Sequence, residues 1–198
     1  MSTQSLILAS GSAIRAKILT GAGLEFSIVK PGVDEGAIKK RLLAEEAALE
    51  EIALALAEAK ALALSPPGAL VIGSDQILEF KGEPYDKPAN LAEAKARLLE
   101  MQGEAHSLIN AVAVAENGRV VFRHIDRPRL FMRRLGADEI DNYLALAGEE
   151  ILSSVGAYQI ESIGSRLFER IEGDHFAVLG LALFPLLDFL RGRGIGGF

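Results

Sequence analysis

The sequence predicts an α/β fold, with a mixed, twisted sheet and flanking helices. Short apolar runs typical of buried strands alternate along the chain with longer helix-forming segments. Asn117-Gly118 joins two strand-like runs, a strong hairpin signal which predicts that part of the sheet is antiparallel. The first predicted strand is not followed by glycines in the GxGxxG spacing, which disfavours a Rossmann domain.

The first half of the chain divides into short strands and helices. An apolar run predicts a strand at 6–9, and Ser12 then caps a helix that runs to about residue 21 and ends before Gly23. Ser65-Pro66-Pro67-Gly68 stops a later helical region. The other expected elements are a strand at 26–29, two helices within 38–64 with a break near 48–50, and strands at 70–73 and 76–80.

The second half carries the predicted hairpin and the remaining helices. We expect a helix at 91–101 that ends before Gly103, because its apolar residues recur at helical spacing. The hairpin strands are expected at about 106–115 and 119–132. The remaining expectations are a helix at 137–147, an irregular segment at 153–165, a strand near 167–171 and a final helix at about 179–191.

Composition and charge exclude several classes of protein. The chain has 198 residues, of which 49% are apolar and 24% charged, and we expect one domain over 1–198. It has no cysteine, which excludes disulfides, thiolate metal sites and a cysteine nucleophile. A net charge of −6 argues against coating nucleic acid or an anionic membrane. The N-terminus lacks a basic signal region and the longest apolar run, 176–187, is too short to cross a bilayer, so we expect a cytoplasmic protein.

The junction between the first strand and helix has the parts of an anion site. Gly11 lets backbone approach a ligand, while Ser10, Ser12 and the helix N-terminal amides offer hydrogen bonds. Arg15 adds a positive charge one turn into the helix. The alternative is a capped surface helix with an arginine that faces solvent.

Two carboxylates are candidates for chemistry. Asp75 directly follows a buried apolar run, at the rim of a sheet where ligands of α/β proteins tend to bind. Glu35, in the loop after the second strand, could join it as a ligand of a metal or of water. The alternatives are a turn aspartate that closes a strand and a glutamate that complements a helix dipole.

Lysines and histidines give weaker patterns. Lys87 precedes a proline that stiffens its loop, and either Lys87 or the helical Lys60 could meet a phosphate, although a lone lysine is usually only solvated. The histidines share no ligand spacing, so we interpret them as structural or surface groups; they are His106, His124 and His175.

Several segments together resemble the Maf family of nucleoside triphosphate pyrophosphatases. They follow one another in the family's order along nearly the whole chain. They are LILASGSAIRAKIL at 6–19, VDE at 33–35, VIGSDQ at 71–76, GEPYDKP at 82–88, GxxH at 103–106, EIDNYL at 139–144, GAYQIE at 156–161 and LFERIEGD at 167–174.

The resemblance implies an elongated, two-lobed fold similar to inosine triphosphatase, with a central cleft. It implies hydrolysis between the α- and β-phosphates of a nucleoside triphosphate with a divalent cation, Mg²⁺ or Mn²⁺, and a homodimer. Asp75 would be the base that activates water, and Glu35 and Asp75 would hold the metal. The residues implied to contact substrate are Ser10, Ser12, Ile14, Arg15, Lys60, Gln76, Lys87 and Glu161.

Two positions bear on which nucleotide is used. Ser74-Asp75-Gln76 together with Glu161 resembles the family's 7-methyl-GTP subgroup, and a carboxylate suits the adjacent N–H donors of guanine. Ile14 departs from the family, because it stands where an arginine is usual and where that subgroup has a tryptophan. The loss of this arginine favours an alternative function, a nucleotide-binding regulator of septum formation with little catalysis.

Overall fold

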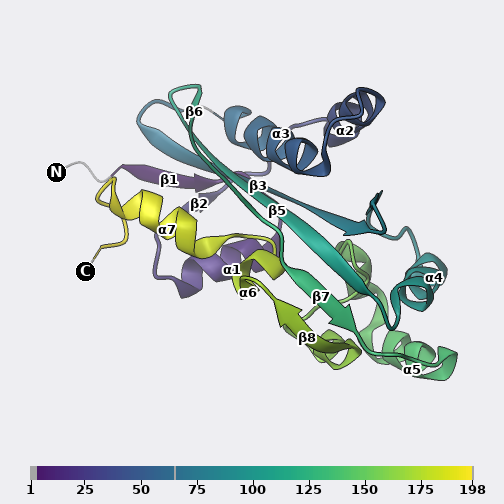
Figure 1. Ribbon diagram of the computed structural model, residues 1–198. Helices are drawn as coiled ribbons and strands as arrows, with labels where there is room; N and C mark the ends of the chain where they lie inside the picture. The colour runs from purple at the N-terminus through teal and green to yellow at the C-terminus, as the bar shows by residue number, and fades with distance from the viewer. Residues whose placement is uncertain (1–3, 65, 198) are drawn as a thin grey trace.

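The computed structural model describes residues 4–64 and 66–197 and is built around one mixed sheet (Figure 1). Its strand order is β2-β1-β3-β5-β7-β8, with β4 paired to β3 and β6 paired to β5. β1 runs parallel to β2 and β3, and the other pairs are antiparallel, which confirms the predicted mixed sheet. The strands are β1 Ser5–Leu8, β2 Ser27–Ile28, β3 Ala69–Phe80, β4 Glu83–Tyr85, β5 Ala105–Glu116, β6 Arg119–Asp126, β7 Arg129–Met132 and β8 Phe168–Glu172.

The helices flank this sheet. They are α1 Ala13–Gly21, α2 Glu35–Ala44, α3 Leu49–Leu62, α4 Leu91–Met101, α5 Ala137–Ala147, α6 His175–Val178 and α7 Leu183–Arg191, with short 3₁₀ helices at Gly148–Ser153 and Ile163–Leu167. The bounds of α4 and α5 are those predicted from the sequence. In the described part of the chain no helix combines the length and apolarity needed to cross a bilayer.

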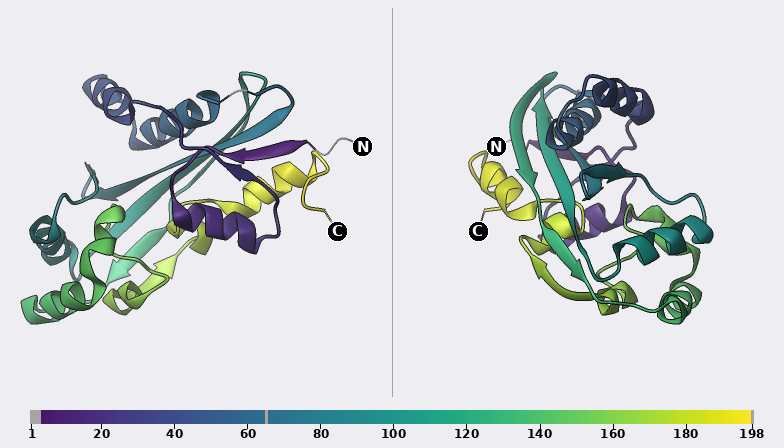
Figure 2. Two further views of the ribbon diagram at one scale, coloured as in Figure 1. Left: turned by 180° about the vertical axis from the view of Figure 1, so that it is seen from behind. Right: turned by 45° about the vertical axis from the view of Figure 1, so that its right-hand side comes forward.

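Two apolar clusters cover opposite faces of β3 and β5. α3 packs on one face, over Ile77 and Ile109, and α1 and α7 pack on the other, over Ile72 and Val112 (Figures 1 and 2). α4 and α5 form a third cluster with the far ends of β3 and β5. The sheet is therefore buried on both faces, and the polar residues in its centre lie between these clusters.

β3 is one continuous strand, and the prediction of separate strands at 70–73 and 76–80 is wrong. Gly73, Ser74 and Asp75 are typical of a turn, but here they pair with β5 through Ala113, Val112 and Ala111. Backbone pairing with the long strand β5 overrides the local turn preference of these residues. Asp75 therefore lies within a central strand rather than at a strand end.

The predicted strand 119–132 is likewise two strands. β6 pairs with the second half of β5 and β7 with its beginning, and Arg127-Pro128 separates them. Proline lacks an N–H group and so cannot donate to a sheet ladder at this point.

Two of the differences between the observed and predicted helix boundaries lie beside the cleft. The final helix begins at Leu183 rather than near 179, because Gly180 adopts a φ of 102° that no helix permits. Glu35 is the first residue of α2 rather than a loop residue, because Asp34 caps the helix by accepting a hydrogen bond from the Ala37 amide at 2.9 Å. Of the predicted stop at 65–68, residue 65 lies outside the described residues, as do residues 1–3 of the N-terminal stretch.

Candidate active site

A large cleft of about 1390 Å³ brings the predicted site residues together. Its walls come from the β1–α1 junction, α2, α3, β3, the loop after β4 and residues 153–161. Each residue that the sequence analysis assigned to substrate, metal or catalysis lines it. These residues are Ser10, Ser12, Ile14, Arg15, Glu35, Lys60, Asp75, Gln76, Lys87 and Glu161.

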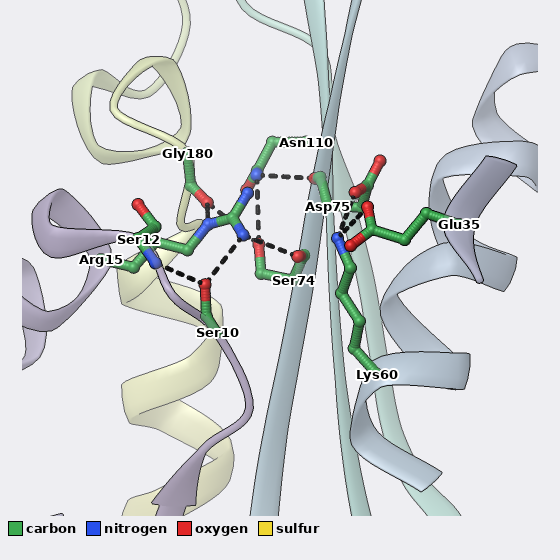
Figure 3. A network of polar contacts seen from close by, with 9 residues as sticks. All are labelled: Ser10, Ser12, Arg15, Glu35, Lys60, Ser74, Asp75, Asn110 and Gly180. Carbon is green, nitrogen blue, oxygen red and sulfur yellow. Dashed lines mark hydrogen bonds and ion pairs between the residues drawn. The ribbon is translucent and has the colours of Figure 1, made fainter. Parts of the chain in front are cut away.

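Beside one face of β3, three charged residues form a cluster in the cleft, here called the charged triple: Glu35, Lys60 and Asp75. The Lys60 ammonium lies 2.7 Å from Asp75 Oδ1 and 2.8 Å from Glu35 Oε2 (Figure 3). The side chains of Lys60 and Asp75 are only 8% and 10% exposed, whereas that of Glu35 is 51% exposed. A ligand can therefore reach the triple from the side of Glu35, while the other two groups are held inside. The family resemblance predicts that Lys60 contacts phosphate, but here both of its ion pairs are with carboxylates.

Gly73 explains why α3 can place Lys60 beside Asp75. A Cβ atom at Gly73 would lie 2.1 Å from the carbonyl oxygen of Ala57 and 2.7 Å from the amide nitrogen of Ala61. Real side chains do not approach backbone atoms this closely, so only glycine allows the helix to pack so near the strand. The close approach fixes the distance between the helix that carries Lys60 and the strand that carries Asp75.

The opposite face of β3 is tied to the end of α6 and to the segment that follows it. Because side chains alternate along a strand, Ser74 and Gln76 point away from Asp75. Ser74 Oγ donates to the carbonyl oxygen of Gly180 at 2.9 Å. Gln76 Nε2 donates to the carbonyl oxygens of Ala177 and Val178 at 2.8 and 3.1 Å. Gln76 was predicted to contact substrate, but its amide N–H groups are hydrogen-bonded to backbone carbonyls.

Arg15 joins the same network (Figure 3). Its Nε donates to the Gly180 carbonyl at 2.7 Å, and its NH1 donates to the Ser74 carbonyl at 2.8 Å and to Ser10 Oγ at 3.3 Å. Burial lowers the pKa of Arg15, and the negative charges of Asp75 and Glu35 oppose that shift. Arg15 therefore combines a structural role with a positive charge near the carboxylates.

The serines of the β1–α1 junction bond to one another rather than cap the helix in the predicted way. Ser12 stands at the N-cap position of α1, but its side chain makes no capping hydrogen bond. Instead its backbone N–H donates to Ser10 Oγ at 3.2 Å. Ser10 Oγ thus accepts from both Ser12 and Arg15, which fixes the shape of this wall of the cleft.

Asn110 is a residue that the sequence analysis missed. It is fully buried in β5, where its Nδ2 donates to the Asp75 carbonyl at 3.1 Å and to Ser74 Oγ at 3.4 Å. Its Oδ1 accepts from the Ala182 amide at 2.8 Å. The available signal was a single amide in the apolar run of a predicted strand, because a buried polar side chain needs partners.

The remaining predicted residues lie on the rims of the cleft. Lys87 and Glu161 are exposed on the loop after β4 and on the segment 153–161, and Ile14 is partly buried in α1. Further cations that the sequence analysis did not single out also line the cleft: Lys17, Lys30, Lys39 and Lys40. A chain with a net charge of −6 thus gathers positive charge around this one cleft.

Comparison with known proteins places the chain in a family. The sequence model described as "Maf-like protein" matches residues 5–193. The chain belongs to the Maf family. A nucleoside triphosphate pyrophosphatase of Caulobacter vibrioides is 49% identical over 196 residues, which cover 98% of each chain. A protein of the same description from Hyphomonas neptunium is 46% identical over 95% of this chain and 96% of its own. A 7-methyl-GTP pyrophosphatase of Mesorhizobium japonicum is 45% identical over 97% and 98%.

The carboxylates of this Maf protein fit a cation that is bound partly by protein and partly by substrate. Mg²⁺ is commonly held by one or two carboxylates together with phosphate oxygens and water, and Glu35 and Asp75 form such a pair. Among the described residues no three His, Cys, Asp or Glu side chains gather as a complete metal site. The donor set therefore suits a cation that arrives with a polyphosphate better than one bound by protein alone.

Proposed function

We propose that this Maf protein hydrolyses nucleoside triphosphates between the α- and β-phosphates, releasing a nucleoside monophosphate and pyrophosphate. The observation that carries the proposal is the charged triple of Glu35, Lys60 and Asp75 in a cleft lined by further cations. Cleavage of a phosphoanhydride depends on a positioned water and on neutralised phosphate charge. The relatives described as nucleoside triphosphate pyrophosphatases support the same reaction.

Asp75 is the base in this proposal. Its Oδ1 accepts from Lys60, and its other oxygen is the acceptor that we assign to the attacking water. The water oxygen forms a bond to phosphorus, its proton passes to the Asp75 carboxylate, and the bond to the leaving phosphate oxygen breaks. Lys60 orients the carboxylate, and its salt bridges to Asp75 and Glu35 hold the two carboxylates next to each other.

The substrate phosphates are assigned to the wall formed by the β1–α1 junction. Ser10, Ser12 and the start of α1 offer hydrogen-bond donors there, and Arg15 adds charge beneath them. Lys87 lines the same cleft from the loop after β4. Glu35 and Asp75 would hold Mg²⁺ or Mn²⁺, and that cation would neutralise charge on the phosphates when bound.

Glu161 is the residue that we assign to recognition of the base. It lies on the cleft rim, and a carboxylate accepts hydrogen bonds from the adjacent N–H donors of guanine. We therefore expect GTP and 7-methyl-GTP to be hydrolysed faster than dTTP and UTP, and Glu161→Gln to narrow the difference. A preference of the unchanged protein for dTTP or UTP would overturn this assignment. Gln76 contributes by holding residues 177–178 in place, because its amide donors are bonded to their carbonyls.

A pyrophosphate-release assay over a panel of nucleotides with Mg²⁺ or Mn²⁺ tests the reaction. Asp75→Asn is expected to lower kcat by about 100-fold or more, the usual contribution of a general base. Asp188→Asn is the matched control, because this exposed carboxylate pairs with Arg191 in α7 and does not line the cleft. Normal turnover by Asp75→Asn would show that the base is another group.

The second candidate function is a nucleotide-binding regulator with little catalysis. Ile14 lines the cleft at the position where the family has an arginine, so one cation is lost from the phosphate wall. Measurable nucleotide binding without release of pyrophosphate from any nucleotide would favour this function. The homodimer that the family resemblance implies stays a prediction, which sedimentation of the purified chain tests.

A further inference from the structure

Two cleft-lining segments outside the sheet core meet at one arginine of α4. The loop 85–88 carries Lys87, and the segment 153–161 carries Glu161, so they hold the groups assigned to opposite parts of the substrate. Arg97 NH1 donates to the carbonyl oxygen of Val155 at 2.5 Å and also contacts the carbonyl oxygen of Asp86. A single guanidinium nitrogen thus joins both segments.

Arg97 is held in a fixed position. Its guanidinium lies 5.2 Å from the ring centre of Tyr85, whose hydroxyl donates to Glu100 at 2.9 Å. Its Nε is buried, and within the described residues it has no hydrogen-bond partner. Partial burial lowers the pKa of Arg97, and the nearby carboxylates of Asp86, Glu93 and Glu100 oppose that shift.

The loop 85–88 is also tied to α2, which lines the same cleft. The Asp86 carboxylate pairs with the ammonium of Lys39 in α2, the helix that begins with Glu35. Arg97 fixes the main chain of Asp86 and Lys39 fixes its side chain. The position of Lys87 relative to the charged triple is therefore set from both sides.

We propose that Arg97 is a positioning residue that sets the distance between the Lys87 loop and the Glu161 segment for substrate binding. It does not line the cleft, so it acts through the two segments rather than on the substrate. This inference rests on the proposed function, because it assigns substrate contacts to both segments. Its expected signature is a weaker complex with the chemical step preserved.

Arg97→Met tests the inference, because methionine keeps an apolar stem beside Tyr85 and removes both hydrogen bonds. We expect KM for GTP to rise by about tenfold while kcat stays within about threefold, the pattern of lost uniform binding. Arg97→Lys is expected to recover part of the loss, since its ammonium can still donate to a carbonyl. Lys95→Met is the matched control on the same helix, because Lys95 pairs with Asp141 and does not line the cleft.

Amide hydrogen exchange of the ligand-free proteins gives a readout independent of catalysis. Arg97→Met should raise exchange in both 85–88 and 153–161, whereas Lys95→Met should raise it in neither. Unchanged exchange in either segment, or a fall in kcat with KM unchanged, would overturn the inference. If the unchanged protein releases no pyrophosphate from any nucleotide, the proposed function fails by itself. Equilibrium binding of GTP then decides the inference, and equal affinity of Arg97→Met and the unchanged protein would overturn it.

Discussion

The two faces of β3 at Ser74-Asp75-Gln76 differ in what their polar side chains contact. Ser74 and Gln76 donate to backbone carbonyls of residues 177–180, and Asn110 and Arg15 complete that network. On the other face Asp75 contacts the Lys60 ammonium, which also pairs with Glu35 (Figure 3). On one face most of the hydrogen bonds end on backbone carbonyls, and on the other face the contacts are ion pairs that open to the cleft.

The three adjacent residues Ser74-Asp75-Gln76 therefore have two different roles. Hydrogen bonds to backbone carbonyls fix residues 177–180, at the end of α6 and just after it, and so shape the cleft wall. In a partly exposed cluster of ion pairs, a charged group can leave its partner and bind a ligand instead. In the buried network of hydrogen bonds to backbone, the same change would leave buried polar groups unpaired. We therefore assign the bond-breaking step to the Asp75 face, and the shape of the phosphate-binding wall to the Ser74 and Gln76 face.

Lys60→Met is expected to have the largest effect, because it removes the centre of the charged face. The Asp75 carboxylate would be left buried without its cation, a change that typically costs about 3–5 kcal/mol of stability. Pyrophosphate release should fall together with stability. Urea unfolding and the pyrophosphate assay measure both, with Lys95→Met, a lysine that does not line the cleft, as the control. Wild-type stability of Lys60→Met would mean that the two faces do not differ as proposed.

His106 provides a test of the architectural side at acidic pH. It lies on the same face of β5 as Asn110, its Nε2 is 2.7 Å from the Tyr158 hydroxyl, and burial lowers its pKa to about 4. As the pH falls below about 6.5, the unfolded chain binds a proton at this histidine and the folded protein does not. The free energy of unfolding should therefore fall between pH 6.5 and pH 4, by up to about 3 kcal/mol from this group.

Denaturant titrations over this pH range measure the effect. His106→Asn should show a shallower loss of stability with falling pH than the unchanged protein, whereas His175→Asn, at an exposed position, should not. Equal pH slopes for His106→Asn and the unchanged protein would mean that His106 is not the group that titrates.

Gly73→Ala sharpens the comparison because it changes only the spacing between α3 and β3. Its Cβ would collide with backbone of α3, so the helix must move, at a typical cost of about 1–3 kcal/mol. The Lys60–Asp75 contact should lengthen and kcat should fall, while the Ser74 face keeps its hydrogen bonds. Gly32→Ala is the control, since a Cβ there meets nothing within 4 Å. Unaltered kcat in Gly73→Ala would show that catalysis does not depend on the spacing between α3 and β3.

Local patterns were enough to predict much of the fold. Helical periodicity gave α4 and α5, and Asn117-Gly118 gave the β5–β6 hairpin, because these signals act over a few residues. The continuity of β3 through Ser74 and Asp75 depends on pairing with a distant strand, which the local sequence does not contain. The family resemblance predicted which residues form the site, but not their hydrogen-bond and ion-pair partners. The contacts of Lys60, Gln76 and Asn110 follow from tertiary packing alone.

The most direct test of the two-face account compares Asp75→Asn with Ser74→Ala. The two residues are adjacent in one strand, so differences in folding and location are minimal. We predict that Asp75→Asn remains folded and lowers kcat for pyrophosphate release by about 100-fold or more. Ser74→Ala should lower the free energy of unfolding by about 1 kcal/mol, the value of a typical hydrogen bond, and leave kcat within a few-fold. Equal loss of kcat in the two variants, or normal turnover by Asp75→Asn, would contradict the account.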